Sequence, residues 1–175
     1  MQQTKHWYAL RISYGRTLKF VAQLKELGIE SYVPMCRKKV QKNGKEPLVT
    51  APAITNLCFA RATKSTLEDI FNGMGETCYA HFMWDRSTRE PIIVSDKAMA
   101  DFIQVSTLMS DDVLYLKDIT SKLQEGQRVR VIDGPFKGVE GTILRIRRSR
   151  RIVVELPGLL AVATSYVDPR FLEVI

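Results

Sequence analysis

The C-terminal third of the chain constrains the fold most, because its strand-like runs are short and end at glycines, prolines or charged turns. The runs are QRVRVID, GTILRIR, RIVVEL, LLAVATSY and FLEVI. So small a sheet removes its open edges by closing on itself. Residues 122–175 are therefore expected to form a small five-stranded β-barrel. Because apolar and polar residues alternate throughout, the barrel is expected to form even in isolation.

The glycine-rich stretch VRVIDGPFKGVEG, residues 129–141, joins the first two of these runs. A phosphate-binding loop of the P-loop type would need GxxxxGK[ST] followed by a helix, whereas this stretch lacks Lys-Ser/Thr and leads into a strand. Its Gly-Pro pair suits a turn, and Phe136 can fold back over the barrel mouth. Gly138 and Gly141 allow a second bend and a close strand crossing. We therefore expect the glycines to shape the backbone.

Residues 1–109 carry a different pattern, in which strand-like runs alternate with helical periods. Strands are predicted at 7–12, 29–35, 54–62 and 78–84, a hairpin with an Asn43-Gly44 turn at 36–50, and helices at 13–29, 65–75 and 96–109. Gly28 is expected to close the first helix, and Ser65 or Thr66 to cap the second. This order indicates an antiparallel sheet with helices packed on it, which places the chain in the α+β class.

Between these two parts lies SDDVLYLKDITS, residues 110–121, which is more acidic and shows no sustained period. We interpret it as a linker between an N-terminal domain at 1–109 and a C-terminal domain at 122–175. A chain of 175 residues with 45% apolar content can supply a core for each of two small domains.

The charge of the chain favours an anionic partner. The formal net charge is +7, and ten of the 26 basic residues fall in RKKVQKNGK, residues 37–45, and RIRRSRR, residues 145–151. Both runs belong to predicted hairpin tips. Nucleic acid is the partner that such runs suit, although basic runs are often only solvated.

Several other classes of protein are not indicated. The three cysteines form no CxxC pair and have no histidine at ligand spacing, so no metal, cofactor or disulfide framework is expected. No nucleophile motif accompanies His6 or His81, so the chain is not expected to be an enzyme. Without a signal sequence or an apolar run of about eighteen residues, a cytoplasmic protein with no membrane contact is expected.

Both halves of the sequence resemble domains of a known family. GQRVRVIDGPFKGVEGTI, residues 126–143, resembles the KOW motif, which forms a small SH3-like barrel. The opening Trp7-Tyr8 strand, the turn at Gly15, the strand end at Pro34 and the ITNLCF strand resemble the N-terminal NGN domain of NusG-family transcription elongation factors. The resemblance covers nearly the whole chain.

Two departures point to a specialised member of this family. The ITNL stretch at residues 54–57 stands where housekeeping NusG has a Phe-Pro-Gly-Tyr type of entry, and GLLAVATSYVDPRFLEVI replaces its Phe-Gly-Arg-x-Thr-Pro-Val stretch. The ending is similar to that of UpxY-type antiterminators, with the RfaH type as a more distant relative. The resemblance implies antitermination in a polysaccharide biosynthesis operon. A housekeeping NusG and a KOW-containing ribosome-associated RNA-binding protein are the alternatives.

The resemblance also implies a contact with RNA polymerase. NGN domains bind the clamp helices of the β′ subunit through an apolar pocket, and the matching positions are Tyr8, Ile54, Leu57, Phe59 and Phe82. The same side chains also suit the core of the sheet. The factor, expected to be a monomer, would act by binding one polymerase conformation better than another, without chemistry.

Nucleic-acid contacts are implied at two further places. In RfaH-like proteins the turn and first helix touch the non-template DNA strand, and the matching positions are Tyr14, Arg16, Lys19 and Gln23. The second place is the arginine run, where Arg147, Arg148, Arg150 and Arg151 suit phosphates of nascent RNA, upstream DNA or ribosomal RNA. The KOW domain is also a candidate for binding a ribosomal protein.

Overall fold

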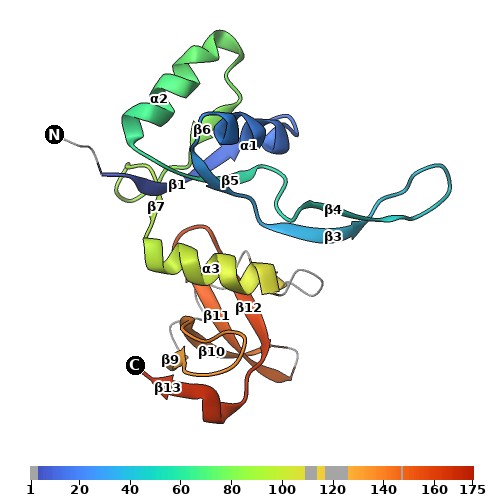
Figure 1. Ribbon diagram of the computed structural model, residues 1–175, viewed down its shortest axis with the longest axis vertical. Helices are drawn as coiled ribbons and strands as arrows, with labels where there is room; N and C mark the ends of the chain where they lie inside the picture. Colours follow the sequence, from blue (N-terminus) through green and yellow to red (C-terminus); the bar gives the residue numbers. More distant parts are fainter. Residues whose placement is uncertain (1–3, 109–113, 117–125, 147) are drawn as a thin grey trace. The chain divides into compact units, whose positions relative to one another are not determined.

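The structure is a computed structural model that describes residues 4–108, 114–116, 126–146 and 148–175 (Figure 1). It divides into two compact units. The first contains Met1–Met35 and Ala51–Asp96, and the second contains Cys36–Thr50 and Lys97–Ile175. Arg147, one of the predicted nucleic-acid contacts, lies outside the described residues.

The first unit contains an antiparallel sheet with two helices on one face. Among the described residues the strand order is β2-β5-β1-β6, with β7 also pairing with β1. The elements are β1 (His6–Ile12), α1 (Thr17–Glu26), β2 (Glu30–Tyr32), β5 (Leu57–Ala62), α2 (Lys64–Gly73), the 3₁₀ turn η1 (Gly75–Thr77), β6 (Ala80–Phe82) and β7 (Ile93–Val94). The predicted α+β class is confirmed, while the two-residue strand β7 was not predicted.

The helices pack through the periodic apolar residues of their sequences. Phe20 and Leu24 of α1 and Leu67 of α2 are fully buried, in one cluster with Leu10 and Ile12 of β1. Fully burying side chains of this size contributes about 1.5–3 kcal/mol each. Gly28 follows α1 with φ of 68°, so the predicted closing glycine is confirmed.

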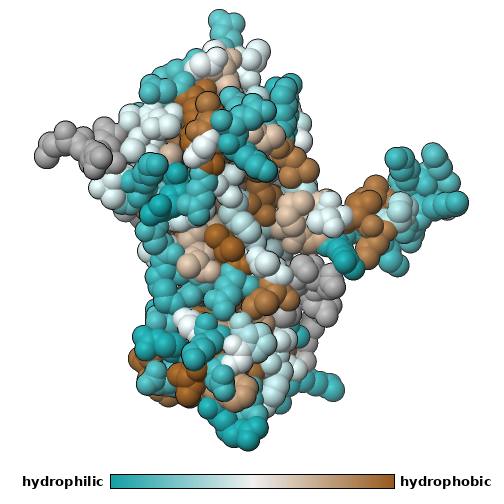
Figure 2. Space-filling view, viewed as in Figure 1, coloured by the Kyte–Doolittle hydropathy of each residue, from teal (hydrophilic) through white to brown (hydrophobic). Residues whose placement is uncertain are grey.

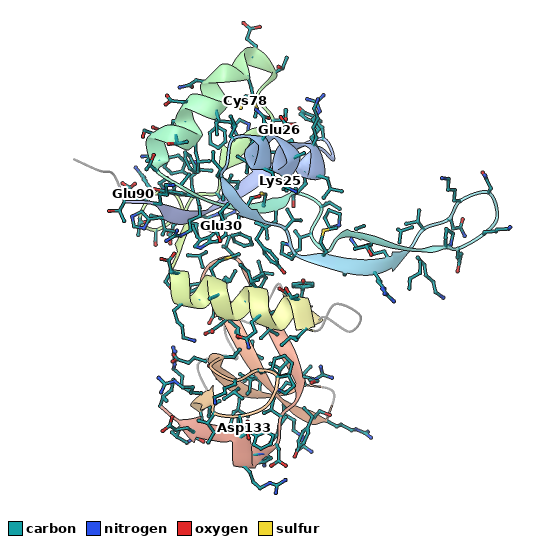
Figure 3. The ribbon with its side chains drawn as sticks, viewed as in Figure 1. Lys25, Glu26, Glu30, Cys78, Glu90 and Asp133 are labelled. Carbon is teal, nitrogen blue, oxygen red and sulfur yellow. The ribbon has the colours of Figure 1, made fainter. Side chains whose placement is uncertain are left out.

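One end of each helix follows a local rule, and one prediction is corrected. Lys25 lies in the last turn of α1, where a cation faces the negative end of the helix dipole (Figure 3). The prediction that Ser65 or Thr66 caps α2 is wrong, because the helix begins two residues earlier. Thr63 has an extended backbone, and its hydroxyl oxygen accepts a hydrogen bond of 3.2 Å from the Thr66 N–H.

The strands β3 (Met35–Lys39) and β4 (Leu48–Pro52) form a two-stranded sheet of their own (Figure 1). Asn43 and Gly44 have φ values of 52° and 72°. Positive φ at both central residues is the requirement of the tight turn that Asn-Gly favours. The predicted hairpin and its turn are therefore confirmed.

In the described part of the second unit, the sheet contains the five predicted C-terminal strands and one more. The order is β13-β9-β10-β11-β12-β8. The elements are β8 (Leu114–Leu116), β9 (Arg128–Val131), β10 (Glu140–Ile146), β11 (Ser149–Leu156), β12 (Leu160–Tyr166), the 3₁₀ turn η3 (Pro169–Phe171) and β13 (Leu172–Val174). The added strand β8 comes from the segment interpreted as a linker.

The expected closed barrel is not seen in the described part of the chain. There β13 pairs only with β9, and the outer edge of β12 pairs with β8. Because β8 already pairs with Ala161, Val162 and Ala163, that part of β12 is not free to close the sheet against another strand. The result is an open sheet with two short strands at its edges.

The glycine-rich loop between β9 and β10 turns as expected. It begins after Asp133, whose carboxylate accepts a 2.8 Å hydrogen bond from the Gly134 N–H (Figure 3). Gly134 and Gly138 have φ values of 85° and 90°, and Phe136 is buried. A Cβ atom at Gly141 would lie 2.5 Å from the Val153 carbonyl oxygen, which confirms the predicted close strand crossing.

The helix α3 (Asp96–Leu108) holds this loop through side chains on its polar positions. Lys97 Nζ donates to Asp101 Oδ1 at 2.6 Å and to the Gly138 carbonyl at 2.7 Å. Gln104 Nε2 donates to the carbonyls of Pro135 at 3.2 Å and Lys137 at 3.3 Å. In return, the Glu140 N–H donates to Asp101 Oδ2 at 3.2 Å. The Asp101 side chain is only 6% exposed. Side chains of α3 therefore hold the loop through hydrogen bonds to its backbone groups.

Candidate functional site

The residues predicted to form the polymerase pocket lie on both faces of the first sheet. Residues paired across neighbouring strands point to the same face. Tyr8 pairs with Ala60, and both belong to the cluster under α1 and α2, as does Phe82. Phe59 pairs with Ala9, one position along β1 from Tyr8, and therefore faces the opposite side. Leu57 shares that side with Phe59.

Tyr8 and Phe82 form the part of the predicted set that the structure brings together. Their ring centroids are 5.3 Å apart, and Phe71 lies 5.1 Å from Phe82 in an edge-on arrangement. Burial raises the pKa of Tyr8, and the negative charge of Glu68 raises it further. The pair is almost fully buried, so it can support a contact surface but offers little area itself.

The structure adds two apolar residues that the sequence patterns did not single out. Ile93 pairs with Tyr8 across β1 and β7, and the Trp84 ring lies 6.3 Å from the Phe82 ring. Trp84 is 53% exposed and Ile93 is 50% exposed. We call these two residues the Trp84 patch. A tryptophan two residues beyond Phe82 was the available signal, since alternation along a strand places both on one face.

A turn held by hydrogen bonds to a carboxylate follows Trp84. The carboxylate of Asp85 accepts hydrogen bonds from the Ser87 N–H at 2.7 Å, the Ser87 hydroxyl at 2.6 Å and the Thr88 N–H at 3.2 Å. These bonds lower the pKa of Asp85, with the Ser87 hydroxyl as the largest cause. The turn therefore holds its shape at neutral pH beside the Trp84 patch.

The other predicted pocket residues are less accessible or outside the strand. Leu57 and Phe59 are 3% and 0% exposed. Ile54 is half-buried and precedes β5, and its carbonyl accepts a hydrogen bond of 3.4 Å from the Leu57 N–H. The predicted strand entry at Ile54 is therefore a turn, and Ile54 is the accessible member of this group.

The turn before α1 presents an exposed aromatic ring. Tyr14 is 84% exposed and has φ of 61°, a left-handed conformation that bulky residues rarely adopt. The Arg16 guanidinium lies 5.9 Å from the Tyr14 ring and 5.0 Å from the Tyr79 ring. Both distances suit a cation–π contact. Backbone strain of this kind clusters at functional sites.

The remaining predicted DNA contacts extend along α1 from this turn. Lys19 is exposed and Gln23 is half-buried, whereas Thr17, Phe20 and Leu24 are buried. The helix therefore keeps the face of Arg16, Lys19 and Gln23 outside the core. Its start is fixed by the Thr17 hydroxyl, which donates to the Thr55 carbonyl at 2.7 Å.

The predicted arginine tip lies between β10 and β11. Arg145 and Arg150 pair directly across these strands, and both are exposed, as is Arg148. Like charges directly opposite each other destabilise a sheet unless an anion neutralises them. Arg151 differs, because its Nη1 donates to the Thr164 carbonyl at 3.1 Å and its Nε is buried without a hydrogen-bond partner among the described residues. Arg151 is held by the sheet.

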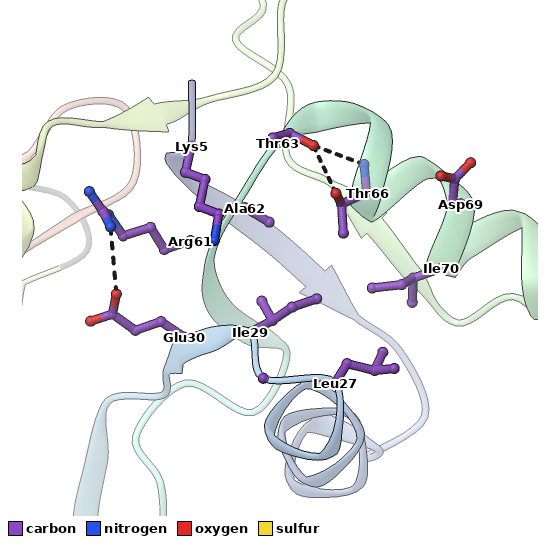
Figure 4. A pocket seen from close by; sticks show the side chains of 11 residues that line it. Lys5, Leu27, Ile29, Glu30, Arg61, Ala62, Thr63, Thr66, Asp69 and Ile70 are labelled. Atoms are coloured by element: carbon purple, nitrogen blue, oxygen red, sulfur yellow. Dashed lines mark hydrogen bonds and ion pairs between the residues drawn. The ribbon is translucent and has the colours of Figure 1, made fainter. Parts of the chain in front are cut away.

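A groove of about 660 Å³ also opens in the first unit (Figure 4). It runs between the end of α1, β2 and the start of α2, with Leu27, Ile29 and Ile70 on apolar sides and Thr63 and Thr66 at its rim. Arg61 stands on another side, paired with Asp96 at 3.1 Å and Glu30 at 4.0 Å. No predicted site residue falls in it.

The described residues show no feature of a metal site or a membrane span. In that part of the chain no group of three or more His, Cys, Asp or Glu side chains could hold a metal ion. The cysteines are free, and burial raises the pKa of Cys58 to about 12. No helix in the described ranges is both long and apolar enough to cross a membrane.

Comparison with known families matches two parts of the chain. The family model described as transcription termination factor NusG matches residues 5–103, and the KOW motif model matches residues 125–155. A search of curated proteins found no significant match. Members of the NusG family bind RNA polymerase and nucleic acids and are not enzymes. Because the first match covers more than half of the sequence and the second agrees with the C-terminal sheet, this chain belongs to the NusG family of transcription elongation and antitermination factors.

Proposed function

We propose that this chain is a specialised elongation factor that binds the β′ clamp helices of RNA polymerase through the Trp84 patch and the residues around it. The supporting observation is that two exposed apolar side chains, Trp84 and Ile93, flank the buried Tyr8–Phe82 pair. An apolar ridge of a helix pair fits such a surface, and tryptophan is a frequent anchor of interfaces. Ile54, Leu57 and Phe59 remain candidate contributors, of which Ile54 is the accessible one.

Binding to purified RNA polymerase tests this contact. The Trp84→Ala/Ile93→Ala variant is expected to lose at least tenfold in affinity, because truncating an anchoring tryptophan costs about 2 kcal/mol or more. Leu18→Ala/Val174→Ala is the matched control, since these two apolar residues are 53% and 62% exposed elsewhere. Equal binding by both variants, with wild-type folding, would contradict the assignment to this patch.

We propose that nucleic acid binds at the Tyr14 turn and at the exposed arginines Arg148 and Arg150. An aromatic ring beside a cation can stack on a base of single-stranded DNA, worth about 1–3 kcal/mol per base. Tyr14→Ala is therefore expected to weaken binding to single-stranded DNA. Tyr166→Ala serves as the control because that ring is 62% exposed on β12. If both variants weaken binding equally, Tyr14 has no special part in it.

We propose that the protein acts in the cytoplasm on a polysaccharide biosynthesis operon. Its two domains are proposed to be residues 1–109 and 122–175, joined by a linker at 110–121. The support is the ITNL entry and the divergent ending of the KOW domain. Deleting the gene should reduce distal transcripts of that one operon. Changes across most genes would instead indicate a housekeeping factor, and cosedimentation with ribosomes without polymerase binding would indicate a ribosome-associated RNA-binding protein.

A further inference from the structure

The basic hairpin tip between β3 and β4 is not used by the proposed function. Residues 37–45 contain five cations and no carboxylate, and residues 39–48 are all exposed. In Figure 2 the end of this hairpin is hydrophilic, with apolar surface behind it. Among the hairpin's apolar residues, Val40 and Leu48 are 43% and 58% exposed. We call Lys39, Lys42 and Lys45 the hairpin lysines.

The geometry of the tip places two of these cations face to face. Lys42 and Lys45 exchange backbone hydrogen bonds of 2.9 and 3.0 Å across the Asn43-Gly44 turn, so their side chains start from directly opposite positions. Like charges so placed repel each other. A hollow of about 550 Å³ lies at the same place, lined by both lysines, Asn43, Glu46 and Pro47. One carboxylate there does not balance the two lysines, so a bound anion would relieve the repulsion.

The chemistry of the tip selects the kind of anion. Residues 37–48 contain no aromatic side chain on which a base could stack. Proteins that hold single strands combine cations with such rings, as at the Tyr14 turn. Lysines without rings suit phosphates, and a two-stranded ribbon fits the major groove of B-form DNA, whereas the major groove of A-form RNA is too narrow.

We propose that the hairpin lysines bind the phosphate backbone of duplex DNA without reading its sequence. The contact goes beyond the proposed function, because it is separate from the Tyr14 turn and needs no polymerase. The two surfaces divide the nucleic acid between them, with single-stranded bases at Tyr14 and duplex phosphates at the hairpin.

Binding of the full chain to a labelled DNA duplex, the corresponding RNA duplex and a DNA single strand, across salt concentrations, tests this proposal. For K39Q/K42Q/K45Q we expect weaker duplex DNA binding and a salt dependence that is shallower by about 0.9 in log–log slope for each lysine removed. Binding to the single strand should change little. Tyr14→Ala should give the opposite pattern, so that failure of either site is seen separately.

Lys5→Gln/Lys25→Gln/Lys64→Gln is the matched control, since it removes the same charge from the first unit. An unchanged duplex slope in the hairpin variant would overturn the proposal. Equal losses from the hairpin and control variants would show only an effect of net charge, and equal losses on duplex and single strand would remove the preference for duplexes. Tighter binding to the RNA duplex than to the DNA duplex would overturn the assignment to DNA.

Discussion

At the scale of single residues, close backbone approach decides what the C-terminal sheet tolerates. Gly141 is required by contact and not by its dihedral angles, because a Cβ atom there would meet the Val153 carbonyl oxygen at 2.5 Å. Gly73, at the end of α2, has open space around it. An added side chain would therefore clash at Gly141 but not at Gly73.

Gly141→Ala is expected to lower the free energy of unfolding by about 1–3 kcal/mol, the usual cost of forcing atoms into a packed site. Urea unfolding followed by circular dichroism measures the change. Gly73→Ala is the control and should be neutral or stabilising by up to about 1 kcal/mol, because alanine is the better helix residue. A neutral Gly141→Ala variant would contradict the close crossing of β10 and β11.

Glu140 gives the second unit a pH dependence. Arg130 Nε donates to its carboxylate at 2.9 Å, and this bond, aided by the charges of Lys97, Arg130 and Arg128, lowers the pKa of Glu140. A carboxylate with a lowered pKa in the folded state stabilises fully above its usual pKa near 4.5 and loses that stabilisation as the pH falls through the lowered value.

The free energy of unfolding of wild type and Glu140→Gln should therefore converge as the pH falls below this range. Above it the wild type should be the more stable of the two. Unfolding in urea at a series of pH values measures both curves. Parallel curves would show that the Arg130 bond does not stabilise the fold.

At the scale of elements, two ion pairs with the same spacing along a helix differ in how deeply their carboxylates are buried. Lys97–Asp101 on α3 and Lys64–Glu68 on α2 both have i,i+4 spacing. The Asp101 side chain is 6% exposed and also accepts from the Glu140 N–H, whereas Glu68 is 49% exposed. Lys97 keeps 51% exposure, so removal of its partner leaves no buried charge.

Asp101→Ala is expected to cost about 1–3 kcal/mol, because the Glu140 N–H then lies in a partly buried place without its acceptor. Amide hydrogen exchange should also speed up at residues 135–140. Glu68→Ala should cost less than about 0.5 kcal/mol, as exposed helix pairs do. Similar costs for both variants would mean that α3 does not fix the loop.

The elements also show what could be predicted from the sequence. Long alternating runs and the Asn43-Gly44 turn carry their own local signals, so their prediction was right. The two-residue β7 and the three-residue β8 are too short to show a period, and they exist because longer strands offer them an edge. The side on which Tyr8 and Phe59 face depends on strand register, which pairs residues far apart in sequence. For the same reason the pairing of Ile93 with Tyr8 could not be predicted, whereas alternation along the strand could have placed Trp84 on the same face as Phe82.

At the scale of the whole molecule, the positive charge is concentrated in two short segments. Residues 37–45 and 145–151 hold ten of the 26 basic residues and none of the 19 acidic ones. The remaining sixteen basic residues are outnumbered by the acidic ones, so the chain outside these segments is net negative. Attraction to polyanions should therefore be local.

Retention on a heparin column measures this distribution. Arg148→Gln/Arg150→Gln is expected to elute at clearly lower salt than wild type, since both residues are exposed beside Arg145. Arg86→Gln/Arg89→Gln, at exposed positions before β7, removes equal charge and should shift elution less. Equal shifts would indicate that only the net charge matters.

The bonds between α3 and the glycine-rich loop bear on how the gene can be divided. Lys97 and Asp101 fall inside the stretch matched to NusG, yet their partners Gly138 and Glu140 fall inside the stretch matched to the KOW motif. Any cut after α3, whether by a protease, by cloning or by recombination between relatives, separates donors from acceptors on both sides. A KOW segment exchanged between two such factors should therefore work best when it is inherited together with its own α3.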